Sequence, residues 1–260
     1  MPAIAPLSRT DSRIRSWAIG AASALLVATG AAHAGEVKVA VAANFTEAAK
    51  EIGARFAAST GHKAVFSFGS TGQLYTQISQ DAPFEIFLSA DQERPKKAAD
   101  ENLAVAGTLF TYATGRIVLF STDKNLVKGE ATLREGRFTR IAIANPATAP
   151  YGAAAIETMK KLRIHEALST KIVQGNSIGQ TYQFVATGNA ELGFVALSQI
   201  AGSAEGSRWI VPPDLHAPIA QDAVLLKKGA ANEAARAFIA FLKGPEARAV
   251  KEKHGYGAAD

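Results

Sequence analysis

Four short segments of the sequence carry hydroxyl or amide side chains among small residues, and none of them contains Lys, Arg, Asp or Glu. The segments are residues 42–45, 69–72, 145–152 and 175–179. Their side chains offer hydrogen-bond donors, and backbone N–H groups at the start of a helix are unpaired and lie at the positive end of its dipole. Such groups can hold a small anion without a charged partner. Because no carboxylate is present to accept a proton, the segments favour a fully deprotonated anion over one such as hydrogen phosphate.

Each segment also has a plainer explanation when it is taken alone, because Ser, Thr and Asn are ordinary residues at helix N-termini. The combination is harder to explain in this way. Four uncharged segments would each have to open a helix at a corresponding place, two in each half of the chain. The residues by themselves therefore predict a binder of a small anion.

The elements that position these segments follow from hydrophobic periodicity, since short apolar runs alternate with segments of helical period. Strands are expected at 37–42, 64–68, 85–89, 141–144, 171–173 and 192–195. Helices are expected at 45–56, around 74–78, and at 92–101, 153–162, 179–186, 232–242 and 245–254. This alternation is typical of parallel sheets flanked by helices. Each polar segment then follows a strand and opens a helix, at the sheet edge where α/β proteins bind ligands.

Two longer strand-like stretches, 112–120 and 219–226, interrupt the alternation and are interpreted as crossings between two lobes. The first lobe is expected to comprise 35–115 and 223–260, and the second 116–222. No flexible linker separates them, so the two crossing strands would form a hinge. The alternative is a single doubly wound domain.

The first 34 residues have the pattern of a signal peptide. Three arginines precede an apolar run at 17–28, and Ala-His-Ala at 32–34 predicts cleavage near Ala34 and export to the periplasm. The alternative is an N-terminal membrane anchor. The chain carries +5, of which the leader's three Arg and one Asp supply +2, which leaves +3 and gives no indication of nucleic-acid binding.

The composition limits the chemistry further. Without cysteine the chain forms no disulfide or thiolate, and its five His are not at metal-ligand spacing. The four segments contain no acid, base or nucleophile pair, and neither Ser70 nor Ser177 has a His nearby in sequence. We therefore expect a binding protein that is not an enzyme. An enzyme on a similar scaffold and an exported sensory or adhesive protein are the alternatives.

Six stretches carry a resemblance to a known family: 41–45, 67–72, 82–91, 145–152, 192–196 and 242–247. In combination they resemble the periplasmic molybdate/tungstate-binding proteins of ABC importers, the ModA-like family, over residues 36–256. The resemblance implies an α/β fold of the type II periplasmic binding class, with two lobes joined by a two-strand hinge. It implies that molybdate or tungstate is captured between the lobes and delivered to the membrane permease of an ABC transporter.

The resemblance also implies a set of ligand groups, with molybdenum held only as the oxyanion, no cofactor and a monomeric protein. The oxyanion-binding residues carried over are Ala43, Asn44, Ser70, Thr71, Tyr151, Ser177 and Ile178. Sulfate or another tetrahedral oxyanion is the alternative ligand.

One position departs from the common pattern of the family. Many members place a Tyr after the Gly-x-Val stretch of the second lobe, where this chain has Ala196. Tyr151 stands where those members carry a small residue, as in a subgroup with Asn in the first loop and Tyr in the third. We expect the Tyr151 hydroxyl to replace the missing phenol. The alternative is that the Tyr151 ring packs on the hinge while its hydroxyl faces water.

Overall fold

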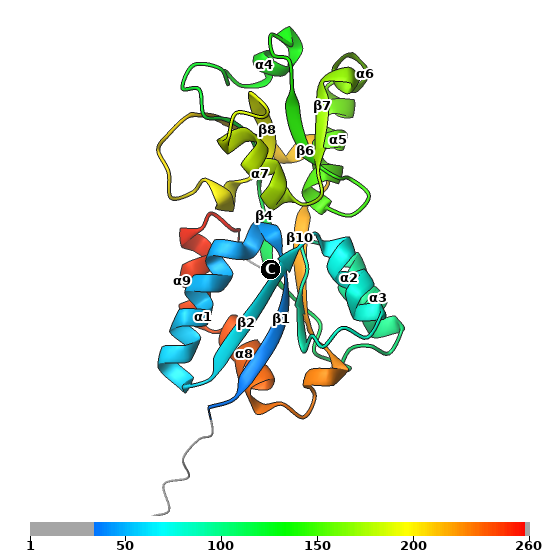
Figure 1. Cartoon of the computed structure of the whole chain (residues 1–260), viewed down its shortest axis with the longest axis vertical. Helices are drawn as coiled ribbons and strands as arrows, with labels where there is room; N and C mark the ends of the chain where they lie inside the picture. The colour runs from blue at the N-terminus through cyan, green and yellow to red at the C-terminus, as the bar shows by residue number, and fades with distance from the viewer. Residues whose placement is uncertain (1–33, 258–260) are drawn as a thin grey trace, which may run out of the picture. The chain divides into compact units, whose positions relative to one another are not determined.

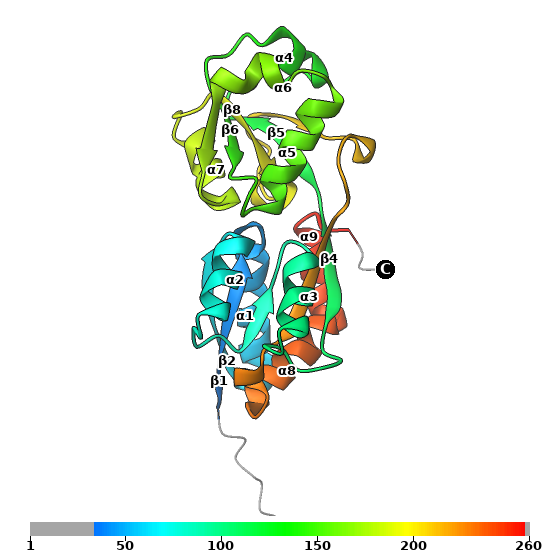
Figure 2. The same cartoon turned by 90° about the vertical axis from the view of Figure 1, so that its right-hand side faces the viewer.

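The computed structural model describes residues 34–257, and these form two α/β lobes (Figures 1 and 2). The predicted signal peptide, residues 1–34, lies outside the described residues except for Ala34. No helix within the described range is long and apolar enough to cross a membrane.

The first lobe is built on a five-stranded sheet in the order β2-β1-β3-β10-β4. Its strands are β1 Glu36–Ala42, β2 Lys63–Gly69, β3 Ile86–Leu88, β4 Phe110–Gly115 and β10 Ile219–Leu225. The first three are parallel, and β10 is antiparallel to both of its neighbours. The helices are α1 Thr46–Thr60, α2 Thr71–Ser79, α3 Glu93–Asp100, α8 Glu233–Lys243 and α9 Pro245–Lys253.

Alternation along β1 explains why helices cover both faces of this sheet. Val37, Val39 and Val41 pack with residues of α1, α8 and α9, whereas Ala40 packs with residues of α2 and α3. Gly61 caps the end of helix α1, with a left-handed φ of 75° and an N–H that donates to the carbonyl of Ala57. Helices α1, α2 and α3 follow the carboxyl ends of the parallel strands at one edge of the sheet, whereas α8 begins at the other edge, where Asn232 donates to the carbonyl of Glu36.

The second lobe repeats this plan with a sheet in the order β7-β6-β8-β5-β9. Its strands are β5 Ile117–Ser121, β6 Ile141–Ala144, β7 Ile172–Gly175, β8 Leu192–Ala196 and β9 Ser207–Ile210. Its helices are α4 Glu130–Glu135, α5 Pro150–Lys161, α6 His165–Leu168 and α7 Ile178–Ala186. The sequence pattern did not predict β9, α4 or α6, which are short and lack a clear period.

The crossings lie where two long strands were predicted, and the two-lobe fold with a two-strand hinge is confirmed. The first stretch is broken at Arg116, so that β4 belongs to the first sheet and β5 to the second. The second stretch is β10, which pairs with first-lobe strands from Ile219 onward. The lobe boundary after residue 222 stays a prediction, and the pairing of β10 begins a few residues before it.

Candidate functional site

The four polar segments come together because the strands that precede them end level with one another. In the first lobe Ala42 pairs with Gly69, and in the second Ala144 pairs with Gly175. Each pair closes two adjacent parallel strands, so the loops that follow lie side by side. Both pairs of loops contribute residues to a single cavity.

Residues of all four segments line one small cavity. Six of the seven residues proposed from sequence line it: Ala43, Asn44, Ser70, Thr71, Tyr151 and Ile178. The seventh, Ser177, does not line the cavity, and its hydroxyl caps α7 by accepting from the N–H of Gln180. Tyr151 is the only ionisable residue in the lining.

The helices that start at this cavity differ from the others in the part of the chain described. Helices α2, α5 and α7 have no acidic residue in the first turn, and the 3₁₀ turn Ala43–Phe45 has none either, as is usual for the 3₁₀ turns of this chain's described part. The other six α-helices each have a Glu there, which offsets the positive end of the helix dipole. The dipoles at the cavity therefore remain available to an anion.

Unpartnered polar atoms mark the same place. Within residues 34–257, the buried side-chain atoms without a hydrogen-bond partner are Asn44 Oδ1, Ser70 Oγ and Thr148 Oγ1. All three belong to the polar segments. Ser70 is only 3 % exposed and stands at the N-cap of α2, yet its hydroxyl makes no capping hydrogen bond. An unsatisfied buried group costs about 1–3 kcal/mol, so these atoms indicate a missing polar partner rather than ordinary caps.

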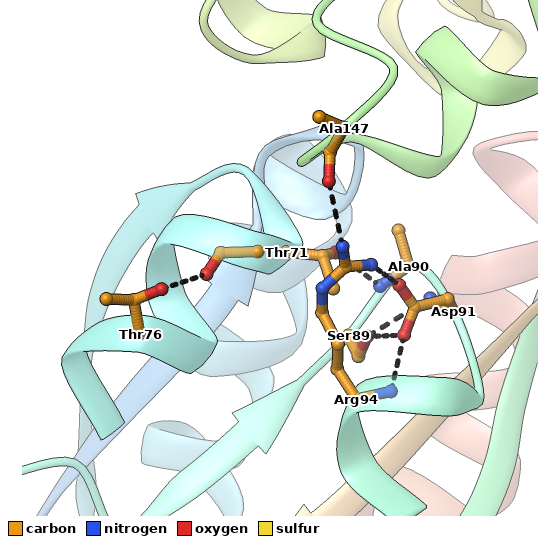
Figure 3. A network of polar contacts seen from close by, with 8 residues as sticks. Thr71, Thr76, Ser89, Ala90, Asp91, Arg94 and Ala147 are labelled. Atoms are coloured by element: carbon orange, nitrogen blue, oxygen red, sulfur yellow. Dashed lines mark hydrogen bonds and ion pairs between the residues drawn. The ribbon is translucent and has the colours of Figure 1, made fainter. Parts of the chain in front are cut away.

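Thr71 connects the cavity to the loop that follows β3. Its hydroxyl oxygen accepts a hydrogen bond from the N–H of Ala90, which also lines the cavity (Figure 3). The hydroxyl hydrogen is not needed for this contact and can be donated elsewhere. Thr71 thus combines a structural contact with a spare donor.

Asn44 uses its side chain differently from the expectation that it donates to an anion. Its Nδ2 carries two hydrogens, which go to Gln221 Oε1 at 2.9 Å and to the Tyr256 hydroxyl at 3.0 Å. No side-chain hydrogen remains for a ligand. What the first loop offers to the cavity is the backbone N–H groups of Ala43 and Asn44, which open a 3₁₀ turn and lack an intrahelical acceptor.

Tyr151 lies between the cavity and the hinge. A Cβ atom at Gly115, the last residue of β4, would lie 2.1 Å from the Tyr151 hydroxyl, so only glycine fits there. The side chain is 1 % exposed, which rules out the alternative of a hydroxyl facing water. Burial raises the pKa of Tyr151 well above its ordinary value of 10, so the phenol keeps its proton.

The lobes contact each other around the cavity. The N–H of Gly72 donates to the carbonyl of Thr148 at 2.9 Å, and the Ser198 hydroxyl donates to the carbonyl of Asn44 at 2.7 Å. On α3, Arg94 reaches the carbonyl of Ala147 at 3.0 Å (Figure 3). Hydrogen bonds of this kind hold the two lobes together over the site.

Several residues around the site could not be found from the sequence. Gln221, Tyr256 and Ser198 all contact Asn44, yet they lie 177, 212 and 154 positions away along the chain. No local pattern links them to the first loop. Within the described range, no group of three or more His, Cys, Asp or Glu residues is placed to hold a metal ion.

Comparison with known proteins places this arrangement in a family. The family described as bacterial extracellular solute-binding protein matches residues 37–257. The molybdate-binding protein ModA of Rhodobacter capsulatus is 57 % identical over 225 residues, which cover 86 % of this chain and 89 % of that protein. Its counterpart from Azotobacter vinelandii is 52 % identical over 245 residues, covering 90 % and 97 %.

A solved structure agrees with these relatives. The periplasmic molybdate-binding protein of Azotobacter vinelandii superimposes with a TM-score of 0.84 and 39 % identity. The match covers 86 % of this chain and 100 % of that chain.

Proposed function

We propose that this chain, which belongs to the bacterial extracellular solute-binding protein family, captures molybdate or tungstate between its lobes for an ABC importer. The observation that carries the proposal is the neutral cavity between the lobes, where four acid-free helix or 3₁₀-turn starts and the unpartnered Ser70 hydroxyl meet. Close relatives named as molybdate-binding proteins support the choice of ligand.

The proposed ligand groups are neutral donors, so the anion keeps its charge and is held by hydrogen bonds alone. Ser70, Thr71 and Tyr151 supply hydroxyl hydrogens. Backbone N–H groups come from Ala43 and Asn44 in the first lobe, and from Ser177 and Ile178 at the start of α7 in the second. Molybdenum is then held only through its oxygens, with no protein atom bound to the metal.

Binding is coupled to closure in this proposal. Two loops come from each lobe, so one anion contacts all four only when the lobes approach, and a ligand that binds the closed form better shifts the population towards it.

The surroundings of the protein follow from the same proposal. The signal peptide is removed near Ala34, the mature chain works as a monomer in the periplasm, and the closed, loaded form docks on the membrane permease. Relatives of this chain include a periplasmic protein and a transporter lipoprotein, which supports an exported location.

A thermal-shift panel on the mature protein tests the proposal with molybdate, tungstate, sulfate, phosphate and chromate. A ligand at a hundred times its dissociation constant adds about 2.7 kcal/mol of stability. For a chain of this size, that raises the melting temperature by roughly 5–11 °C. We expect this shift with molybdate and tungstate. If only sulfate raised the melting temperature, or if none of the anions did, the proposed ligand would be overturned.

A further inference from the structure

We infer that Gln221, on the strand that returns the chain to the first lobe, is a positioning residue that makes Tyr151 a hydrogen-bond donor to the bound anion. This inference rests on the proposed function and deepens it. Gln221 is fully buried in β10, opposite Ala113 of β4. The register of the two strands shifts directly after it, between Gln221 and Asp222, and such irregularities re-aim side chains near functional sites.

The backbone carbonyl of Asn44 starts a chain of hydrogen bonds whose direction is fixed, because a carbonyl oxygen only accepts. The Tyr256 hydroxyl lies 2.7 Å from it and must donate its only hydrogen there. With that hydrogen used, the same hydroxyl can only accept from Nδ2 of Asn44, 3.0 Å away. The Asn44 amide is thus held with its nitrogen toward Tyr256.

The second hydrogen on Asn44 Nδ2 then points to Gln221, which must meet it with Oε1 at 2.9 Å. The Tyr112 hydroxyl, which has a single hydrogen, lies 3.1 Å from the same oxygen and 3.0 Å from the carbonyl of Ser89. The amide nitrogen of Gln221 is left facing Tyr151, whose hydroxyl oxygen accepts from it at 3.2 Å. The hydrogen of Tyr151 therefore points elsewhere, and within residues 34–257 the phenol donates no hydrogen bond, although the Asn44 side chain also lies within reach of it. Since Tyr151 lines the cavity, an anion there can take that hydrogen.

The opposite orientation of the Gln221 amide shows why this matters. If Oε1 faced Tyr151, the phenol would donate to Gln221 and turn its oxygen lone pairs toward the cavity, where they would repel an anion. The Tyr151 hydroxyl and the Gln221 amide have no free space beside Gly115, because even a Cβ atom there would lie 2.1 Å from the Tyr151 hydroxyl and 2.5 Å from Gln221 Nε2. Gln221 therefore sets the direction of the phenol without contacting the ligand.

Gln221→Glu tests the inference, because it keeps the shape and replaces only the donor end of the side chain. At about pH 8 the introduced carboxylate accepts from Tyr151 and turns its hydrogen away from the anion, so molybdate affinity should fall on the order of a hundredfold. Burial and a nearby anion raise the pKa of such a carboxyl. Once protonated, it can donate to Tyr151 as the amide did, so affinity should recover at least about tenfold at pH 5.5.

The phenols of Tyr112 and Tyr151 contact Gln221, Tyr256 is linked to it through Asn44, and the carboxylates that act on Tyr112 are Asp91 and Asp222. All of them are also present in the unmodified protein, whose binding curve therefore records their contribution. Asp222→Asn is the matched control on the same strand. Its carboxylate accepts from Thr111 at 2.7 Å and from Gln92 at 3.2 Å and does not line the cavity.

Gln221→Met is a neutral variant of similar volume, for use if the buried carboxyl prevents folding. Its affinity should be lower than that of the unmodified protein and should not change with pH, because Met neither orients the phenol nor titrates. Combined with Tyr151→Phe, its loss should be less than additive, because both changes act through the Tyr151 hydroxyl.

Calorimetric titration with molybdate between about pH 5.5 and 8 separates the outcomes. The inference requires flat affinity for the unmodified protein and Asp222→Asn, with affinity that rises on acidification only for Gln221→Glu. Affinity in Gln221→Glu that equals that of the unmodified protein, or that stays weak at all pH values, would overturn the inference, as would full additivity of Gln221→Met with Tyr151→Phe. No molybdate or tungstate binding by the unmodified protein would instead overturn the proposed function.

Discussion

Replacing Tyr151 with Phe removes one hydroxyl and leaves the ring in the core. The proposed hydrogen bond from this hydroxyl to a charged acceptor is worth about 1.5–3 kcal/mol. Affinity for molybdate should therefore fall roughly ten- to hundredfold. Contact with water does not reduce this loss of affinity, because the side chain is only 1 % exposed.

The same change also acts on the ligand-free protein. Gln221 Nε2 loses the acceptor that it has at 3.2 Å, and a buried donor left without a partner costs about 1–3 kcal/mol. Each kcal/mol lowers the melting temperature of a chain this long by roughly 2–4 °C. The variant should thus be modestly less stable without ligand, and it should gain less stability than the unmodified protein when molybdate is added.

Isothermal titration calorimetry measures the affinity, and thermal unfolding without ligand measures the stability. Tyr182→Phe, in α7 and outside the cavity lining, is the control for the loss of a phenol in the second lobe. Unchanged affinity in Tyr151→Phe would refute the assignment of the phenol as a ligand group. The idea that it replaces the residue missing at Ala196 would then fail as well.

Four further predictions test the site and the fold. Molybdate affinity should vary less than tenfold between about pH 6 and 9, because Tyr151 is the only ionisable residue in the lining and its pKa is raised by burial, and titrations across this range check it. Ser70→Ala should weaken binding roughly tenfold or more while leaving the stability of the ligand-free protein unchanged or higher, since it deletes an unpartnered atom. Calorimetry measures the affinity and thermal unfolding the stability, and a loss of stability would show instead that Ser70 is only a helix cap. Gly115→Ala should lower both affinity and melting temperature, whereas Gly202→Ala, where an added Cβ meets nothing within 4 Å, should alter neither. Hydrogen bonds from Lys253 and His254 lower the pKa of Glu51 to about 2 from 4.5, so the stability that they contribute is present above pH 4.5 and lost as pH falls toward 2. Glu51→Gln should lower the free energy of unfolding by about 1 kcal/mol at neutral pH and should weaken its fall in acid, as measured by urea unfolding.

The architecture was predictable because it depends on patterns that are local in sequence. The periods of two and 3.6 residues located most strands and helices, and the crossings at 112–120 and 219–226 stood out by their length. The change of lobe was expected between residues 115 and 116, but the stretch 112–120 was expected as one continuous strand, and its break at Arg116 was not predicted. The short elements β9, α4 and α6 contain too few residues to show a period.

The cavity lining was predictable for the same reason, because each loop follows a strand whose end could be read from the sequence. The partners of Asn44 were not, since Gln221 and Tyr256 approach it only through the fold. The role of Asn44 shows the limit most clearly. Its residue type indicates a donor, but which of its atoms is free depends on neighbours distant in sequence.

The missing acidic residues at the starts of α2, α5 and α7 have a consequence for the lifetime of the protein. Each acid in a first turn would add about 0.3–1 kcal/mol to the fold, and these helices do without it. An anion in the cavity supplies that charge to all three helices at once. The unloaded protein is thus the form that opens more often to proteases, so the amount of protein that survives outside the cytoplasm should follow the supply of its ligand.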